Sequence, residues 1–90
     1  MSTSQNERER LPNGWEVVCR WAGEGYGVVL AYNKSSHSPY VTWRFNPGSP
    51  GDTYWEHYFG GENAAKAAWD DFGKRVADCI KLCRDDHFAM

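Results

Sequence analysis

The 90-residue chain has no long hydrophobic run and no strong excess of either charge. A membrane-spanning helix needs about 20 consecutive, mostly apolar residues, and the polar first ten residues also lack the apolar core of a signal peptide. The net charge of −2 provides no general attraction to phosphate backbones, so a nucleic-acid partner is not expected. These absences favour a cytoplasmic protein that contacts no membrane.

Cysteine is also scarce, because the chain has three, Cys19, Cys79 and Cys83. An odd number at these spacings does not form a disulfide framework, and we expect three free thiols. Cys79, Cys83 and His87 follow one another at steps of four, which is a spacing that suits zinc on a helix. The two cysteines also continue an apolar helical stripe, however, and a structural zinc site needs a fourth ligand. We therefore predict no metal and no cofactor.

Aromatic residues are abundant: five Trp, five Tyr and four Phe make up 16% of the chain. They supply large buried area per residue, which lets a short chain form one sufficient core but not two. The turn signal Pro12-Asn13-Gly14 precedes the first apolar run. The predicted organisation is a flexible N-terminal arm (1–13), a single domain (14–86) and a C-terminal tail (87–90).

Alternating apolar and polar residues predict strands, and a later change to steps of three and four predicts a helix. The strands are expected at residues 15–22, 26–32, 40–45 and 53–59, and the helix from Glu62 onward. Residues 46–52 contain two Pro-Gly pairs, so we expect no regular structure there. The predicted fold is α+β, a four-stranded antiparallel meander packed on one C-terminal helix (ββββα) in two layers.

One helix covers only one face of such a sheet. We expect the helix to cover Trp15, Val17, Trp21, Val28, Leu30, Val41, Trp43, Phe45, Trp55 and Phe59. The other face would then carry tyrosines and arginines among smaller apolar residues, a composition typical of protein interfaces. The predicted partner-binding residues on that face are Arg20, Tyr40, Arg44, Tyr54, Glu56 and Tyr58.

Three alternatives account for the same face. Antiparallel sheets commonly expose tyrosines, and the N-terminal arm could fold over them. The tyrosines could stack single-stranded nucleic acid, with Arg20 and Arg44 contacting phosphates. The face could also pair with a second copy of the chain to form a homodimer.

Acidic residues of the helix offer a further surface. Glu62, Asp70, Asp71 and Asp78 could form a negative strip that substitutes for phosphates in a basic channel. Lysines and arginines interleaved with them weaken such a strip. We rank it below the aromatic face.

No pattern of catalytic residues is evident. The cysteines fall on positions predicted to face inward, where a thiol is inert. His57 alternates onto the face predicted to meet the helix. Gly23, Gly25 and Gly27 lie between two strands with no helix after them, which indicates a hairpin and not a phosphate loop. We predict that the protein is not an enzyme and has no catalytic residues.

Three segments together resemble small proteins of bacterial phages and mobile elements. They are Tyr-Val-Thr-Trp-Arg-Phe-Asn at residues 40–46, Tyr-Trp-Glu-His-Tyr-Phe at 54–59, and Ala-Trp-Asp-Asp-Phe-Gly-Lys-Arg at 68–75. Proteins of that setting include many anti-CRISPR proteins, compact binders that block Cas effectors sterically or imitate nucleic acid. The resemblance implies a protein-binding accessory or inhibitor in the host cytoplasm, with a host protein complex such as a Cas effector subunit as its partner.

Overall fold

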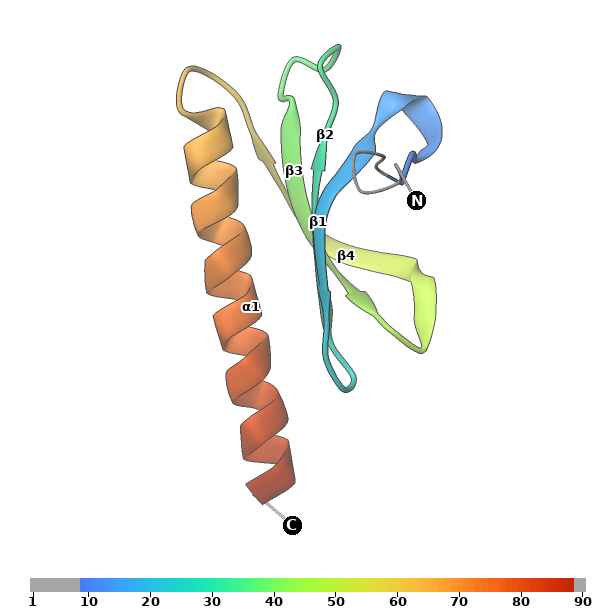
Figure 1. The fold of residues 1–90 in the computed structure, drawn as a ribbon, viewed down its shortest axis with the longest axis vertical. Coiled ribbons are helices and arrows are strands. Elements are labelled where there is room, and N and C mark those ends of the chain that lie inside the picture. The colour runs from blue at the N-terminus through green and yellow to red at the C-terminus, as the bar shows by residue number, and fades with distance from the viewer. Residues whose placement is uncertain (1–8, 89–90) are drawn as a thin grey trace, which may run out of the picture.

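A computed structural model describes residues 9–88, with side chains described for residues 9–49 and 53–84. A short 3-10 turn, η2 (Pro12–Gly14), precedes β1 (Glu16–Ala22), β2 (Gly27–Tyr32), β3 (Tyr40–Asn46) and β4 (Ser49–Phe59), and α1 (Ala64–Phe88) follows. The strands form one antiparallel sheet in the order β1-β2-β3-β4. The helix lies along one face of this sheet (Figure 1). The predicted ββββα fold is confirmed.

Some predicted boundaries are wrong. The fourth strand begins at Ser49, which pairs with Asn46, so part of the Pro-Gly segment belongs to the sheet. Because β4 is an edge strand, a proline within it need not interrupt a ladder on both sides. The helix continues to Phe88, into the predicted tail.

Residues 9–13, which the sequence assigns to the arm, lie against the sheet. The amide of Val17 donates to the carbonyl of Glu9 at 2.8 Å, and Leu11 packs on the hydrophobic side chains of the sheet. The rest of the predicted arm lies outside the described residues.

Two irregularities in pairing decide which side chains share a face. Val17 pairs with Ala31 but Cys19 with Leu30, so β1 carries one extra residue, Val18. Thr42 and Arg44 of β3 are two residues apart, but their partners on β4, His57 and Tyr54, are three residues apart. β4 therefore also carries one extra residue. Each extra residue changes the face that the rest of its strand presents, because side chains alternate along a strand.

The helix-covered face follows three rows of paired residues across the sheet. One row is Cys19, Leu30, Thr42 and His57; the second is Trp21, Val28, Arg44 and Tyr54; the third is Glu16, Tyr32, Tyr40 and Phe59. Val28 and Leu30 are completely buried there against Ala68, Phe72 and Cys79 of α1. This is the main core.

The opposite face, which we call the open face, carries a second apolar cluster. Its buried members are Val17, Val29, Ala31, Val41 and Phe45, and Leu11, Trp15 and Trp43 pack against them. One close approach helps to pack it, because Phe45 lies directly over Gly27, where a Cβ atom would come within 2.3 Å of the ring. A side chain at position 27 would displace Phe45.

The predicted assignment of side chains to faces is therefore wrong for much of the sheet. Trp15, Val17, Val41, Trp43 and Phe45 lie on the open face and not under the helix. Trp21, Val28, Leu30 and Phe59 lie on the helix side as expected.

Within the described residues, no helix is long and apolar enough to cross a membrane.

Candidate functional site

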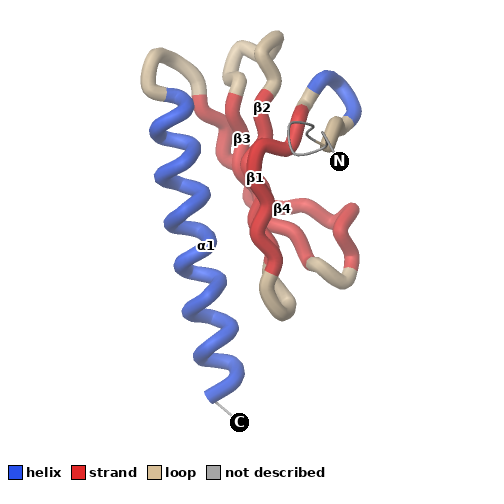
Figure 2. The backbone as a smooth tube through the Cα atoms, viewed as in Figure 1, coloured by secondary structure: helices blue, strands red, loops and turns tan. Residues whose placement is uncertain are grey.

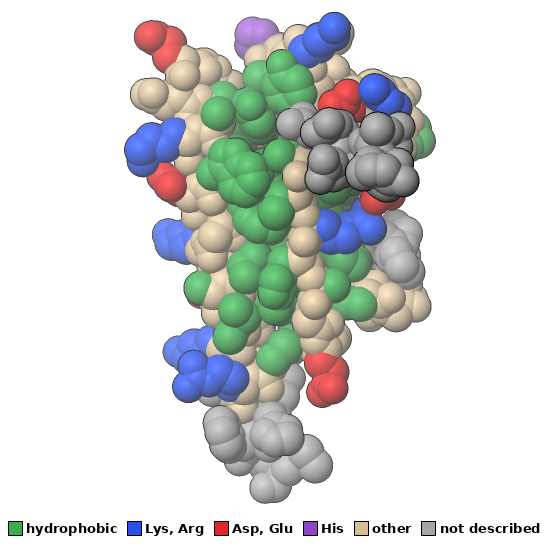
Figure 3. Space-filling model, viewed as in Figure 1, with side chains coloured by type: hydrophobic (Ala, Val, Ile, Leu, Met, Phe, Trp, Pro, Cys, Tyr) green, Lys and Arg blue, Asp and Glu red, His purple; other side chains and the backbone are tan. Residues whose placement is uncertain are grey.

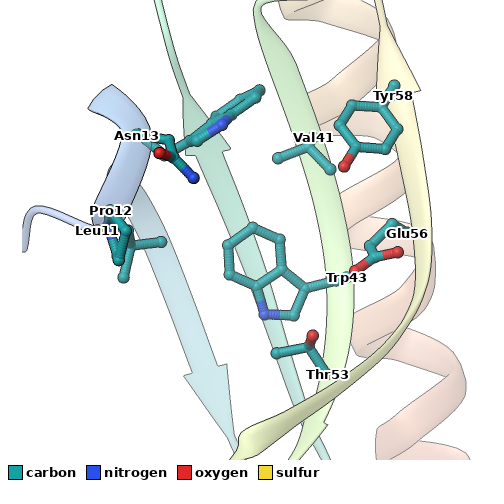
Figure 4. A pocket seen from close by; sticks show the side chains of 9 residues that line it. Leu11, Pro12, Asn13, Val41, Trp43, Thr53, Glu56 and Tyr58 are labelled. Atoms are coloured by element: carbon teal, nitrogen blue, oxygen red, sulfur yellow. The ribbon is translucent and has the colours of Figure 1, made fainter.

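The open face contains a groove next to Trp43. One end is a cavity of about 260 Å³ lined by residues of η2, of its two flanks, and of β3 and β4, among them Leu11, Pro12, Trp15, Trp43 and Tyr58. It adjoins a depression of about 560 Å³ that shares Leu11, Pro12, Trp43 and Thr53. Figure 4 shows the Trp43 indole standing between Leu11 and Pro12 on one side and the β4 side chains on the other. We call these two cavities together the Trp43 groove.

The N-terminal wall of the Trp43 groove is fixed by backbone hydrogen bonds. The amide of Leu11 donates to the carbonyl of Trp15 at 2.8 Å, which closes the η2 turn. Asn13 adopts a positive φ of 69°, a conformation that asparagine tolerates better than most residues. The side-chain amide of Asn33 donates to the carbonyl of Asn13 at 3.0 Å and ties the turn to the end of β2. The wall is therefore part of the folded domain.

The other wall is the outer strand of the sheet. Glu56 and Tyr58 lie two residues apart on β4, and both line the groove. The ring of Tyr58 contacts the ring of Trp15 edge-on, with centroids 6.3 Å apart. Figure 2 shows that the N-terminal turn and the β3–β4 hairpin both project from the side of the sheet away from α1. The groove runs between these two projections.

The structure divides the six predicted partner-binding residues between the two faces. Glu56 and Tyr58 line the cavity beside Trp43, and Arg20 lines the adjoining depression. Tyr40, Arg44 and Tyr54 instead lie on the helix side. The prediction that all six share one face is wrong. The residue inserted in β4 separates Tyr54 from Glu56 and Tyr58, and the regularly paired β3 presents Tyr40 and Arg44 to the helix.

Arg44 lies among aromatic rings under the helix. Its guanidinium carbon is 4.8 Å from the ring centroid of Trp55, 5.5 Å from that of Tyr26 and 5.8 Å from that of Tyr54. These separations are within the range of cation–π attraction. Arg44 therefore stabilises the packing of β3, β4 and the β1–β2 hairpin.

Beside Arg44, Asp71 fastens the helix to the sheet. Its Oδ2 accepts hydrogen bonds from the Thr42 hydroxyl and from Arg75 Nε at 3.0 Å, and lies 3.1 Å from His57 Nδ1. Burial alone would raise the pKa of Asp71. The hydrogen bonds from Thr42 and His57 and the charge of Arg75 outweigh burial, so the pKa of Asp71 lies below its ordinary value.

This arrangement interrupts the predicted acidic strip of Glu62, Asp70, Asp71 and Asp78. Asp71 faces the sheet, and Asp70 pairs with Lys66 at 2.9 Å. Asp78 lies beside Lys74 and Arg75 around a cavity of about 320 Å³. The four carboxylates do not form a continuous negative surface.

The residues that sequence reasoning missed are Trp15, Trp43 and Leu11. The sequence pattern predicts Trp15 and Trp43 on the face under the helix and Leu11 in the arm. One signal was present: β2 is apolar at every position from Val28 to Ala31, a pattern typical of a strand buried on both faces.

A second apolar surface lies along the seam between α1 and β1. Figure 3 shows hydrophobic side chains in a stripe between these two elements. Trp69 is 45% exposed and Ile80 41% exposed, and the partly buried Cys19 and Trp21 of β1 belong to the adjacent core cluster. This seam is a competing candidate for partner contact.

The cysteines offer little reactive surface. Cys79 is completely buried, and burial raises the pKa of its thiol. Cys83 donates a hydrogen bond to the carbonyl of Glu24 at 3.3 Å. Among the residues that the structure describes, no group of three His, Cys, Asp or Glu side chains could hold a metal ion; the His87 side chain lies outside them.

Comparison with protein-family models, with curated proteins and with solved structures found no match to this chain. The function must therefore be argued from the geometry.

Proposed function

We propose that this protein is a non-enzymatic binding module that contacts a protein partner through the Trp43 groove. The observation that carries the proposal is the second apolar cluster, which lies on the sheet face away from the only helix among residues 9–88 and is cut by a groove beside a half-buried tryptophan. The five buried members of that cluster are at most 9% exposed, so the accessible surface of the groove comes from the partly buried Leu11, Trp15 and Trp43 and from Tyr58, which is 60% exposed. Accessible apolar and aromatic side chains gathered around a groove commonly mark an interaction site. Tryptophan, tyrosine and arginine are the usual energetic anchors of protein interfaces.

The charged groups support binding over catalysis. His57 and Asp71 are close enough to form a catalytic pair, but Asp71 is already occupied by Thr42 and Arg75 in fastening the helix to the sheet. Cys79 is buried, with a thiol whose pKa is raised by burial. A nucleophile needs an accessible, activated group.

The single-stranded nucleic-acid alternative has less support in this arrangement. It requires Tyr40, Tyr54 and Tyr58 with Arg20 and Arg44 on one surface, and these residues lie on two faces. Arg20 is also paired with Glu9 at 2.7 Å, which reduces the charge available for a phosphate.

The resemblance to phage and mobile-element proteins gives the proposal its specific form. The protein would be an accessory or inhibitor protein, and its partner a host protein complex such as a Cas effector subunit. Occupation of the partner's surface by the open face would block that partner sterically.

A pull-down from host lysate tests the proposal. Wild type is compared with a Trp43→Ala, Tyr58→Ala double variant and with Trp69→Ala, which removes an exposed aromatic ring of α1 that does not line the groove. Circular dichroism checks that each variant is folded. We expect a stoichiometric protein partner that the groove variant loses and Trp69→Ala retains, since truncating a central anchor typically costs about 2 kcal/mol or more. Loss with Trp69→Ala alone, or recovery of nucleic acid that nuclease removes, would contradict the proposal.

A further inference from the structure

The cavity beside Trp43 combines aromatic rings with one uncompensated charge. Of its nine lining residues Glu56 is the only charged one, and Trp15, Trp43 and Tyr58 are aromatic. Among the described residues Glu56 forms no ion pair, whereas Glu9 and Arg20 in the adjoining depression pair with each other. The charged side chain of the Trp43 groove that has no ion-pair partner among the described residues is therefore the Glu56 carboxylate, which is negative.

The aromatic rings leave space for a ligand group. Tyr58 packs edge-on against Trp15, but neither ring forms a stacked or edge-on pair with Trp43 within the described part of the chain. Tyr58 is 60% exposed, so its ring is accessible. In Figure 4 Tyr58 and Glu56 lie along β4 on one side of Trp43, with Thr53 below them. A group that enters beside the indole would meet rings and a carboxylate together.

The size of the cavity limits what it can hold. Small-molecule sites usually enclose about 300 to 1,000 Å³, whereas the cavity beside Trp43 taken alone is about 260 Å³ and is open to solvent. It therefore suits one side chain of a larger partner better than an entire metabolite. The adjoining depression is lined in part by Val29 and Phe45. It provides an apolar surface for the neighbouring residue of the partner protein.

Charge decides which kind of side chain fits. An anionic group would be repelled by Glu56, and a purely apolar group would gain nothing from that exposed carboxylate and would remove water from any part of it that the group covers. A cation is attracted by the faces of Trp and Tyr rings and by the carboxylate together. We propose that the cavity accepts the cationic head of a lysine or arginine side chain from the partner protein. This inference rests on the proposed function, because it names the chemistry of the same groove.

Small probes test the cavity without knowledge of the partner. The probes are N-acetyl-lysine methylamide and N-acetyl-arginine methylamide, with N-acetyl-norleucine methylamide as the neutral control of similar length. Binding is followed by NMR on ¹⁵N-labelled protein, using the indole N–H signal of Trp43 assigned with a Trp43→Phe variant. The lysine and arginine arms distinguish an ammonium from a guanidinium.

We expect at least one cationic probe to shift the Trp43 signal saturably and to bind about fivefold or more tightly than norleucine, a difference in the range of cation–π contacts. Glu56→Gln should weaken cation binding by a similar factor and leave norleucine unchanged. Glu9→Gln is the matched control, because Glu9 lies in the adjoining depression and is already paired. Equal binding of all three probes, or an unchanged affinity in Glu56→Gln, would overturn the inference.

The outcome separates this inference from the function on which it rests. Loss of the protein partner in the Trp43→Ala, Tyr58→Ala variant without any preference for cations would overturn the cation site and leave the protein-binding function standing. Preference for a cation together with unchanged capture of the partner would support the site and contradict the proposed function.

Discussion

Arg75 donates a hydrogen bond from Nη2 to the carbonyl oxygen of Trp55, whose backbone φ of 59° lies in the left-handed region. Trp55 belongs to the irregular part of β4, where three residue steps face two on β3. The insertion turns Glu56 and Tyr58 toward the open face while Tyr54 and His57 stay on the helix side. A contact of the helix thus supports the strand that forms one wall of the Trp43 groove.

The backbone of Trp55 predicts an unusual order of stability. An L-residue in the left-handed region costs roughly 1–2 kcal/mol relative to glycine. Both Trp55→Gly and Trp55→Ala remove the ring from Arg44, but only glycine relieves the backbone. We expect Trp55→Gly to be more stable than Trp55→Ala by about 1 kcal/mol in urea denaturation, whereas glycine in a regular strand is the less stable. The ordinary order, with the alanine variant more stable than the glycine variant, would contradict a left-handed backbone at Trp55.

Removal of Arg75 should destabilise the protein strongly. Its side chain is 9% exposed, and Arg75→Ala removes hydrogen bonds to Asp71 and to the Trp55 carbonyl. The pair with Asp71 is partly buried, so its loss should cost more than an exposed pair and up to the roughly 3 kcal/mol of a fully buried one, which urea denaturation would detect. Lys66→Ala is the matched control on the same helix, since its pair with Asp70 is exposed and should contribute less than about 0.5 kcal/mol. Equal effects of the two substitutions would mean that Arg75 does not fasten β4.

Asp71 predicts a loss of stability in acid. Its pKa is lower in the folded state than the ordinary value of 3.8, so folding is favoured by the ionised form. That contribution is present above about pH 4 and is lost as the pH falls through the folded-state pKa. Wild type should exceed Asp71→Asn in stability at pH 5, and the margin should shrink below about pH 4. A margin that stays unchanged at pH 3, measured by urea denaturation, would remove Asp71 as the cause.

The three thiols should differ in reactivity. Cys79 is completely buried and burial raises the pKa of its thiol, whereas Cys19 and Cys83 are half-buried. Ellman's reagent at pH 8 should label Cys19 and Cys83 in the native protein and Cys79 only after unfolding in urea. Cys79→Ala should remove the slow reaction alone. Rapid labelling of Cys79 under native conditions would show that the helix does not stay packed on the sheet.

The order of the elements could be read from the sequence, because alternation and helical periodicity are local signals. The face on which each side chain lies could not be read in the same way, since a single inserted residue moves every later side chain of its strand to the opposite face. Val18 has this effect in β1, and the irregular turn at Trp55 has it in β4. In β3 the alternation is regular, but it does not reveal which side meets the helix: the sequence pattern predicts the more apolar side with Trp43 under the helix and Arg44 on the open face, the reverse of the structure.

Only part of the candidate site could be predicted from the sequence, because the inserted residue in β4 decides which side chains of that strand reach the groove. Glu56 and Tyr58 follow the irregular residue and lie in the groove, whereas Tyr54 precedes it and lies on the helix side. The contribution of Leu11 depends on a long-range hydrogen bond between Asn33 and Asn13 that no local pattern reveals.

Site-specific photo-crosslinking tests most directly whether the Trp43 groove binds the partner. A photoreactive p-benzoyl-phenylalanine replaces Thr53, which lines both cavities of the groove, or Ala77, an exposed residue of α1. In a lysate that contains the partner, the groove account predicts a crosslinked protein from position 53 and none from position 77. A partner crosslinked from position 77 and not from position 53 would contradict it.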